Sequence, residues 1–238
     1  MTGQPCSVPV KQDGYVSIYH PKRGITHRVN DSKGVFFMTN VKANTLRLVQ
    51  LGLLSGLIIL LQTVFIIPLP GSLTLSLVLV PIVVGAVLFG PRDGAILGGV
   101  FGVLVAIMAL QGSLGLLTNM MVAYNPVLTV VICVLKGVAA GWVPGLIAAA
   151  FKKQSFIGIL LAAAAAPILN TGIFLLGMLT VFKGVMMDFA AQIGMGGTSA
   201  VYFAIVVLVG VNFLIEFGAN LILSPAIASI VKAFQKMK

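Results

Sequence analysis

The sequence predicts an all-α integral membrane protein, a bundle of six transmembrane helices with both termini in the cytoplasm. The chain of 238 residues is 59% hydrophobic and only 8% charged. Its mean hydropathy of +1.11 is too high for the surface of a water-soluble domain. After residue 44 there is room for six apolar runs of roughly 20 residues, the length of a helix that crosses a bilayer.

Residues 1–44 form a polar N-terminal extension, and residues 45–238 form the membrane-embedded domain. Alternating side chains in GYVSIYH and RVNDSKGVFF are typical of a weak hairpin. The charged and apolar regions of a signal peptide are missing from this extension. The segment from Met38, MTNVKANTLRLVQ, resembles a natural start. We therefore expect residues 1–37 to be an upstream extension that is not native to the protein.

Apolar runs and turn signals define the six spans, and the turns PLPGS and GPRDG end the first two. The expected spans are 46–67, 75–89, 95–110, 126–150, 156–181 and 201–223. The uncharged connection QGSLGLLTNMMVAYN is too polar for lipid, so we expect it to fold back over the bundle. The glycine-rich connection FKGVMMDFAAQIGMGGTSA is expected to form a flap. The amphipathic tail after Ser224 and Pro225 is expected to lie at the membrane interface.

Basic residues predict the orientation of the bundle. With six spans, Lys183 stands alone on one side. Eight basic residues share the other side: Lys42, Arg47, Arg92, Lys152, Lys153, Lys232, Lys236 and Lys238. The positive-inside rule places both termini in the cytoplasm and the loops after spans one, three and five outside. The excess of 15 Lys and Arg over 5 Asp and Glu therefore indicates membrane topology, with no nucleic-acid partner.

The residues needed for several kinds of chemistry are missing from the spans. Both histidines, His20 and His27, lie in the N-terminal extension, which disfavours Ser-His hydrolysis and zinc chemistry within the membrane. Cys6 and Cys133 form no plausible disulfide framework or metal cluster. There is no G-x-x-x-x-G-K-[ST] phosphate loop, so ATP would have to be used by another subunit. We expect no enzyme activity, no metal and no cofactor in this chain.

Neutral amides and hydroxyls converge toward the outer half of the predicted bundle. At 1.5 Å per residue, Asn170 lies about 21 Å above the cytoplasmic start of span five, and Asn212 about 18 Å below the outer start of span six. Asn125 stands at the outer end of span four. The remaining neutral candidates for binding a small polar solute are Thr171, Tyr124, Asn119 and Gln62. For each asparagine, a helix cap or a bond between helices is the alternative.

Two charged residues are expected near mid-membrane. Lys136 shares a helix face with Asn125, and Glu216 lies in a polar stripe with Asn220. An ionised lysine at the bilayer centre costs about 2.5–3.5 kcal/mol, so it indicates a functional site or a paired charge. One interpretation is a mutual ion pair of Lys136 and Glu216. The other is that Lys136 attracts an anionic substrate, or that Glu216 carries a proton.

Four separated segments carry a resemblance to a known family. They are SLTLSLVLVPIVVGAVLFGPRDGAILGGVFG, NPVLTVVICVLKG, APILNTGIFLLGM and VNFLIEFGANLILSPAI. In this order they resemble the S components of energy-coupling factor (ECF) transporters, particularly the pantothenate-type group. The resemblance covers about residue 44 to the C-terminus, and residues 1–37 have no counterpart. It implies a six-helix protein of the bacterial cell membrane that captures a vitamin from outside. It further implies a transmembrane coupling subunit and two cytoplasmic ATPases as partners.

The resemblance also suggests roles for residues. In this family a small-xxx-small motif on the first helix meets the coupling subunit, and Gly52 and Gly56 match its spacing, with glycine where alanine is usual. The substrate is held by outer helix ends and by the loops after spans one, three and five. The carboxylate of pantothenate would suit Lys183 or Lys136. Its amide and hydroxyls would suit three further residues: Asn125, Asn170 and Thr171.

Three alternatives remain open. Related S components take folate, cobalamin, riboflavin or thiamine precursors, so another vitamin is one. A self-sufficient proton-coupled carrier that uses Glu216 is the second, although one carboxylate without a histidine or a second acid is thin support. The third is a structural or regulatory membrane protein, against which the long uncharged outer connection argues mildly.

Overall fold

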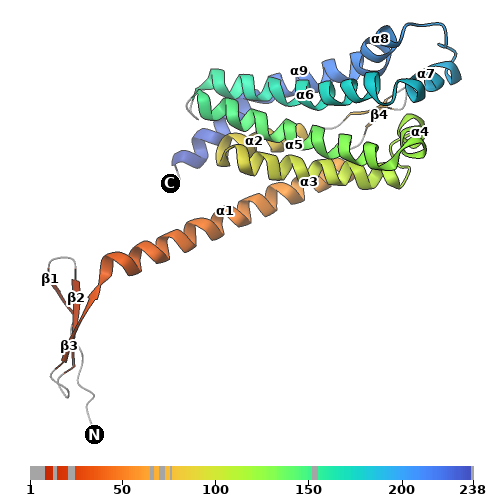
Figure 1. The fold of residues 1–238 in the computed structure, drawn as a ribbon. Helices are drawn as coiled ribbons and strands as arrows, with labels where there is room; N and C mark the ends of the chain where they lie inside the picture. Colours follow the sequence, from red (N-terminus) through yellow and green to blue (C-terminus); the bar gives the residue numbers. More distant parts are fainter. Residues whose placement is uncertain are drawn as a thin grey trace. The chain divides into compact units, whose positions relative to one another are not determined.

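The computed structural model describes residues 9–12, 15–20, 25–64, 67–69, 73–75, 77–151 and 155–236, and side chains within 45–64, 77–151, 155–210 and 213–233. The chain divides into two compact units, Met1–Gln50 and Leu51–Lys238. Figure 1 shows the order of the helices and strands along the chain. The division predicted at residue 44 stays a prediction.

The first unit contains a small antiparallel sheet. Its strands β1 (Pro9–Gln12), β2 (Tyr15–His20) and β3 (Ile25–Asn30) pair in the order β1-β2-β3. In the β2–β3 pair, Tyr15 lies opposite Asn30 and His20 opposite Ile25. The predicted hairpin is therefore present, but only RVN of the second segment is strand. The rest of that segment begins helix α1 (Asp31–Val64), which starts well before the predicted first span.

The second unit is a bundle of apolar helices (Figure 1). Its main helices are α2 (Leu79–Phe89), α3 (Pro91–Leu110), α5 (Pro126–Ala150), α6 (Phe156–Thr180) and α9 (Val211–Lys236). Five segments in the described part of the chain are long and apolar enough to cross a membrane: Thr45–Val64, Pro91–Leu110, Pro126–Ala150, Phe156–Thr180 and Phe213–Ala233. With the shorter helix α2 they confirm the predicted six-helix membrane bundle.

Helix α2 is shorter than the predicted second span. Strand β5 (Leu73–Leu75), which pairs with β4 (Ile67–Leu69), contains Leu75, the residue at which that span was expected to begin, and α2 begins only at Leu79. Helix α2 has 11 residues, and those from Pro81 to Val87 are all buried. An apolar run of this length is typical of a helix inside a protein core, because it is too short to cross a bilayer alone. The sequence showed the apolar run but not which side of it faces protein.

The last helix corrects the prediction for the C-terminal tail. Helix α9 continues through Pro225, and Ile227 and Val231 beyond it are buried in the bundle, so the tail is no separate interfacial segment. A proline inside a helix leaves the carbonyl four residues earlier without its amide donor. Here that carbonyl belongs to Leu221, and the Ser224 hydroxyl donates to it at 2.7 Å. This hydroxyl replaces the missing amide, which allows the helix to continue in an apolar environment.

Helices α3 and α5 pack backbone against backbone. A Cβ atom added at Gly98 would overlap the carbonyl of Gly137, and one added at Gly94 would overlap the carbonyl of Gly141. At Gly102 the added atom would lie 2.7 Å from the carbonyl oxygen of Cys133. Small residues at a spacing of four allow such close approach between helices in membranes. Helices α3 and α5 therefore approach closely over at least two helical turns.

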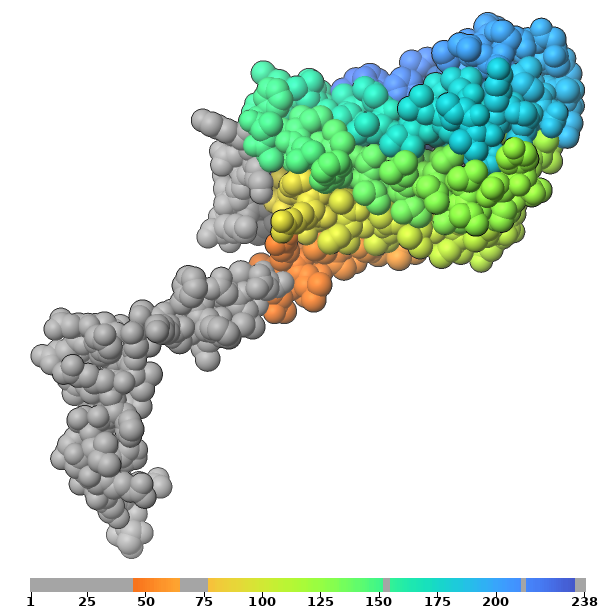
Figure 2. Space-filling model, in the orientation of Figure 1, coloured from red at the N-terminus to blue at the C-terminus, as the bar shows by residue number. Residues whose placement is uncertain are grey.

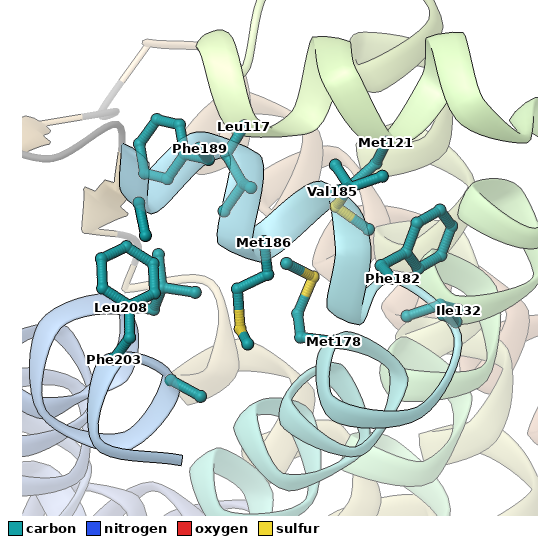
Figure 3. Close-up of a cluster of buried hydrophobic side chains, with 12 residues drawn as sticks. Leu117, Met121, Ile132, Met178, Phe182, Val185, Met186, Phe189, Phe203 and Leu208 are labelled. Carbon is teal, nitrogen blue, oxygen red and sulfur yellow. The ribbon is translucent and has the colours of Figure 1, made fainter. Parts of the chain in front are cut away.

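A methionine- and phenylalanine-rich cluster fills one end of the bundle. Helices α4 (Leu116–Tyr124) and α7 (Lys183–Gln192) fold over this end, as expected for the two long connections (Figure 3). Leu117 and Met121 of α4 and Met186 and Phe189 of α7 are buried there. The Phe189 ring meets the Phe203 ring edge-on, with centroids 6.3 Å apart. The charge distribution predicts that this end faces outward.

Candidate functional site

Helices α6 and α9 run antiparallel along one side of the bundle. Ala166 of α6 belongs to the same buried cluster as Ile227 of α9. Nearer the other end, Met178 of α6 shares a cluster with Leu208, which lies in the π-helical turn η1 (Phe203–Gly210) that precedes α9. Figure 1 shows the two helices side by side. These shared clusters show which ends of α6 and α9 lie near each other.

Asn170 and Asn220 lie within about one helical turn of each other along the bundle. Asn170 follows Ala166 by 4 residues, and Asn220 precedes Ile227 by 7 residues. At 1.5 Å per residue these steps are about 6 Å and about 10 Å toward the α4–α7 end. Each asparagine also continues the buried stripe of its helix, since residues four and seven apart share a helix face.

The Asn220 side chain is the most buried amide among the described residues, with 1% of its surface exposed. Its Nδ2 donates to the backbone carbonyl of Glu216 at 2.8 Å. The Oδ1 atoms of Asn220 and of Asn170 are both buried and accept no hydrogen bond within the described part of the chain. Buried polar atoms are nearly always satisfied in native proteins, so these two acceptors indicate a place for a donor.

Charged groups stand one helical turn closer to the α4–α7 end. The Lys136 ammonium of α5 lies 5.4 Å from the centroid of the Phe174 ring of α6, a cation–π contact. Phe174 follows Asn170 by one turn, and Glu216, which is 5% exposed, precedes Asn220 by one turn. We call Lys136, Asn170, Glu216 and Asn220 the interior polar set. The predicted ion pair of Lys136 with Glu216 stays a prediction.

The methionine- and phenylalanine-rich cluster separates the interior polar set from the α4–α7 end. Met178, Phe182 and Met186 lie in this layer, and Figure 3 shows their side chains within the cluster. The space-filling view shows closely packed atoms over α3, α5 and α6 (Figure 2). Methionine side chains are flexible and repack readily. A small molecule that reached the set from this end would have to displace them.

Asn125 has the structural role that the sequence left open, because it caps α5. Its Oδ1 accepts from the amide of Leu128 at 3.0 Å, and its backbone carbonyl accepts from the Thr129 hydroxyl at 2.9 Å. Tyr124, just before it, is 65% exposed and meets the Phe182 ring edge-on at 5.8 Å. Substrate contacts of Asn125 and Tyr124 remain predictions.

The other candidate residues lie at several places in the bundle. Thr171 is half-buried beside Asn170. Gln62 is 3% exposed on α1, and its Nε2 lies 3.9 Å from the sulfur of Met108 on α3. Asn119 and Lys183 are exposed on α4 and α7. Asn212 belongs to α9, but its side chain lies outside the described residues. The structure thus places Lys136 against Phe174, one turn from Asn170 on α6, while the roles of the other candidate residues stay predictions.

Sequence reasoning did not select Asn220 as a binding residue. The available signal was the stripe that it forms with Glu216 at a step of four, but the depth count favoured residues of the outer half. What singles out Asn220 is the unmet Oδ1, which needs coordinates to be seen. Within the described residues no group of three or more His, Cys, Asp or Glu side chains is placed to hold a metal ion.

The predicted partner motif lies on an open helix surface. Gly52 and Gly56 are exposed on α1, and a Cβ atom added at either would meet no atom within 4 Å. Neighbouring exposed leucines, Leu53 and Leu57, complete an apolar face. Such a face suits lipid or another helix, so contact with a coupling subunit stays a prediction.

Comparison with known proteins identifies a family. The family model described as "ECF transporter, substrate-specific component" matches residues 46–228, more than three quarters of the chain. The match covers the interior polar set and the open face of α1. No curated protein matches the chain by sequence.

Proposed function

The chain belongs to the substrate-specific (S) component family of ECF transporters, and we propose that the vitamin it captures is pantothenate. Membership of this family makes the chain a multi-pass protein of the cell membrane and a transport subunit rather than an enzyme. It also implies a substrate and an ECF module as partners. The identity of the vitamin goes beyond the family.

The observation that carries the proposal is a cation and hydrogen-bond acceptors facing one apolar interior. Pantothenate has a carboxylate, an amide, two hydroxyls and a gem-dimethyl group. Lys136 would pair with the carboxylate, since this residue is half-buried and its ammonium lies against Phe174. Asn170 and the adjacent Thr171 would meet the polar groups. The surrounding aliphatic and methionine side chains would contact the dimethyl group.

We further propose how the chain works with its module. A transmembrane coupling subunit would dock on the open face of α1 at Gly52 and Gly56, and two cytoplasmic ATPases would supply the energy. This chain would itself hold no nucleotide, metal or cofactor. Substrate would enter through the α4–α7 end and leave on the opposite side after the subunit topples in the membrane.

Equilibrium binding to the purified chain in detergent tests the proposal. The panel is pantothenate, folate, cobalamin, riboflavin and a thiamine precursor, and pantothenate is expected to bind most tightly. Lys136→Met should weaken pantothenate binding about 10- to 100-fold, because a charge-assisted hydrogen bond is worth about 1.5–3 kcal/mol. Lys232→Met removes an exposed lysine of α9 and should leave binding unchanged.

Three results would contradict the proposal. Tighter binding of another vitamin would exclude pantothenate as the cargo. Equal affinity of wild type and Lys136→Met would exclude the carboxylate contact. Unchanged affinity in both Asn125→Ala and Asn170→Ala would show that the polar pocket is misplaced.

A further inference from the structure

The direction in which the Asn220 amide faces is fixed by its own helix. Its Nδ2 donates to the Glu216 carbonyl at 2.8 Å. Flipping the amide would place Oδ1 against that carbonyl oxygen, and two acceptors repel. Oδ1 therefore faces away from its helix backbone as an acceptor, in a side chain that is 1% exposed. What this residue lacks is a donor, not an acceptor.

Asn170 supplies a second acceptor within about one helical turn of Asn220. Its Oδ1 is buried and accepts no hydrogen bond from the described residues. It follows the buried residues Ala163 and Ala166 by seven and four positions, so it shares their face toward the interior of the bundle. Two packed helices, α6 and α9, thus each carry a buried, unsatisfied carbonyl oxygen.

We propose that Asn170 and Asn220 recognise the inner end of the bound vitamin through hydroxyl or N–H donors, and that the anionic end of the vitamin points toward Lys136. This inference rests on the proposed function only in that the ligand is the vitamin of an S component. It holds for any vitamin with both kinds of group, and pantothenate is one. Asn220 is then a specificity-determining residue.

Lys136 supports this orientation, because it is the cation of the interior polar set. A carboxylate beside Asn170 and Asn220 would face acceptor oxygens only, and one beside Glu216 would face a second carboxylate, whereas a donor satisfies both amides. The ammonium of Lys136, on α5, lies against Phe174, one turn from Asn170 toward the α4–α7 end. The site therefore separates an anion-binding side from a donor-binding side by about one helical turn, or about 5 Å. A ligand with one anionic end and one hydroxyl- or amine-bearing end matches it.

Two variants of Asn220 separate recognition from structure. Asn220→Leu removes the acceptor but keeps the approximate volume. Asn220→Asp keeps a carbonyl acceptor, and in its protonated form it also keeps a donor for the Glu216 carbonyl. Ser224→Ala is the matched control one turn away, because the Ser224 hydroxyl is already used within its helix at 2.7 Å.

The probe is the member of the five-vitamin panel that binds the wild-type chain most tightly, measured by calorimetry in detergent. We expect Asn220→Leu to bind it about 10- to 100-fold more weakly, as for a lost hydrogen bond at a buried group. Asn220→Asp and Ser224→Ala should stay within about threefold of wild type, a change below 1 kcal/mol. Without vitamin, Asn220→Leu should melt no lower than wild type, because it removes an unsatisfied acceptor.

With pantothenate as probe, replacing its carboxylate by an alcohol tests the orientation. The loss of binding free energy caused by this change should add to the loss caused by Asn220→Leu. It should not add to the loss caused by Lys136→Met, because the carboxylate and Lys136 form one and the same contact. The opposite pattern would show that the carboxylate lies at Asn220 and would overturn the inference.

The remaining outcomes decide between the two proposals. If a vitamin binds and Asn220→Leu binds it equally well, the acceptors are occupied by water alone and the inference is wrong, while the transport assignment stands. If Asn220→Leu lowers both affinity and vitamin-free melting temperature, its role is structural and the inference is again wrong. If pantothenate does not bind but another vitamin does, the pantothenate proposal is wrong and the inference is tested on that vitamin. If no vitamin binds, both are wrong.

Discussion

The backbone contact between α3 and α5 makes a quantitative prediction for Gly102→Ala. A methyl group at Gly102 would lie 2.7 Å from the Cys133 carbonyl oxygen and 2.8 Å from the Val134 Cα. Both are backbone atoms, so a side-chain rotation cannot relieve the overlap. The helices must separate by about 0.7 Å to reach an ordinary contact of 3.4 Å. Overpacking of this kind costs about 1–3 kcal/mol.

The matched control is Gly99→Ala, three residues earlier on the same helix. Its added methyl would lie 3.6 Å from Val138 Cγ2, an ordinary contact. Both variants gain the same helix preference of alanine over glycine, about 0.5–1 kcal/mol, so their difference isolates the packing. Each kcal/mol lowers the melting temperature of a domain of this size by about 2–4 °C. We expect Gly102→Ala to melt about 2–12 °C below Gly99→Ala in detergent, as followed by size-exclusion chromatography after heating. Equal melting temperatures would refute the backbone-contact argument.

Two further predictions concern the partner face and the α5 cap. Gly56→Leu should leave vitamin affinity unchanged, since no atom lies within 4 Å of an added Cβ, but should reduce co-purification with the coupling module and ATP-driven uptake. Ala149→Leu, which enlarges an exposed position of α5, is its control, and equal uptake by both variants would exclude α1 as the docking face. Asn125→Ala should lower the melting temperature by about 2–4 °C through loss of the cap, about 1 kcal/mol. Ser199→Ala loses a longer cap bond of 3.3 Å and should lower it less, so a larger effect there would contradict the capping argument.

The fold was largely predictable because the membrane imposes one dominant rule. Every apolar run near 20 residues must become a helix, since no other structure satisfies its backbone in lipid. The misassigned parts are those in which side chains override that rule. Pro225 indicates a helix end in most sequences, but the Ser224 hydroxyl bonds the carbonyl that the proline leaves open. The run of α2 was visible, but its burial by neighbouring helices depends on tertiary contacts.

The site was less predictable, because it depends on whether individual polar atoms have hydrogen-bond partners. Lys136 stood out in the sequence through the cost of a charge in the membrane, and its ammonium lies against the Phe174 ring of α6. Asn125 and Asn220 are the same residue type on apolar helices. One has its Oδ1 satisfied as a helix cap, and the other has its Oδ1 buried and unmet. Periodicity cannot separate these two cases, since the difference depends on the helix end and on the neighbouring helix.

The glycine contacts of α3 and α5 also limit where a ligand can bind. A pair of helices that excludes even a methyl group at Gly94, Gly98 and Gly102 leaves no space for a vitamin between them. The proposed site of Lys136, Asn170 and Asn220 is consistent with this limit, because none of its residues lies between α3 and α5. Alanines of α6 pack in the same buried cluster as Ile227 of α9, and Asn170 and Asn220 follow about one and two turns beyond. A vitamin held by these two amides would contact α6 and α9, and the close contact of α3 with α5 would not have to open for it.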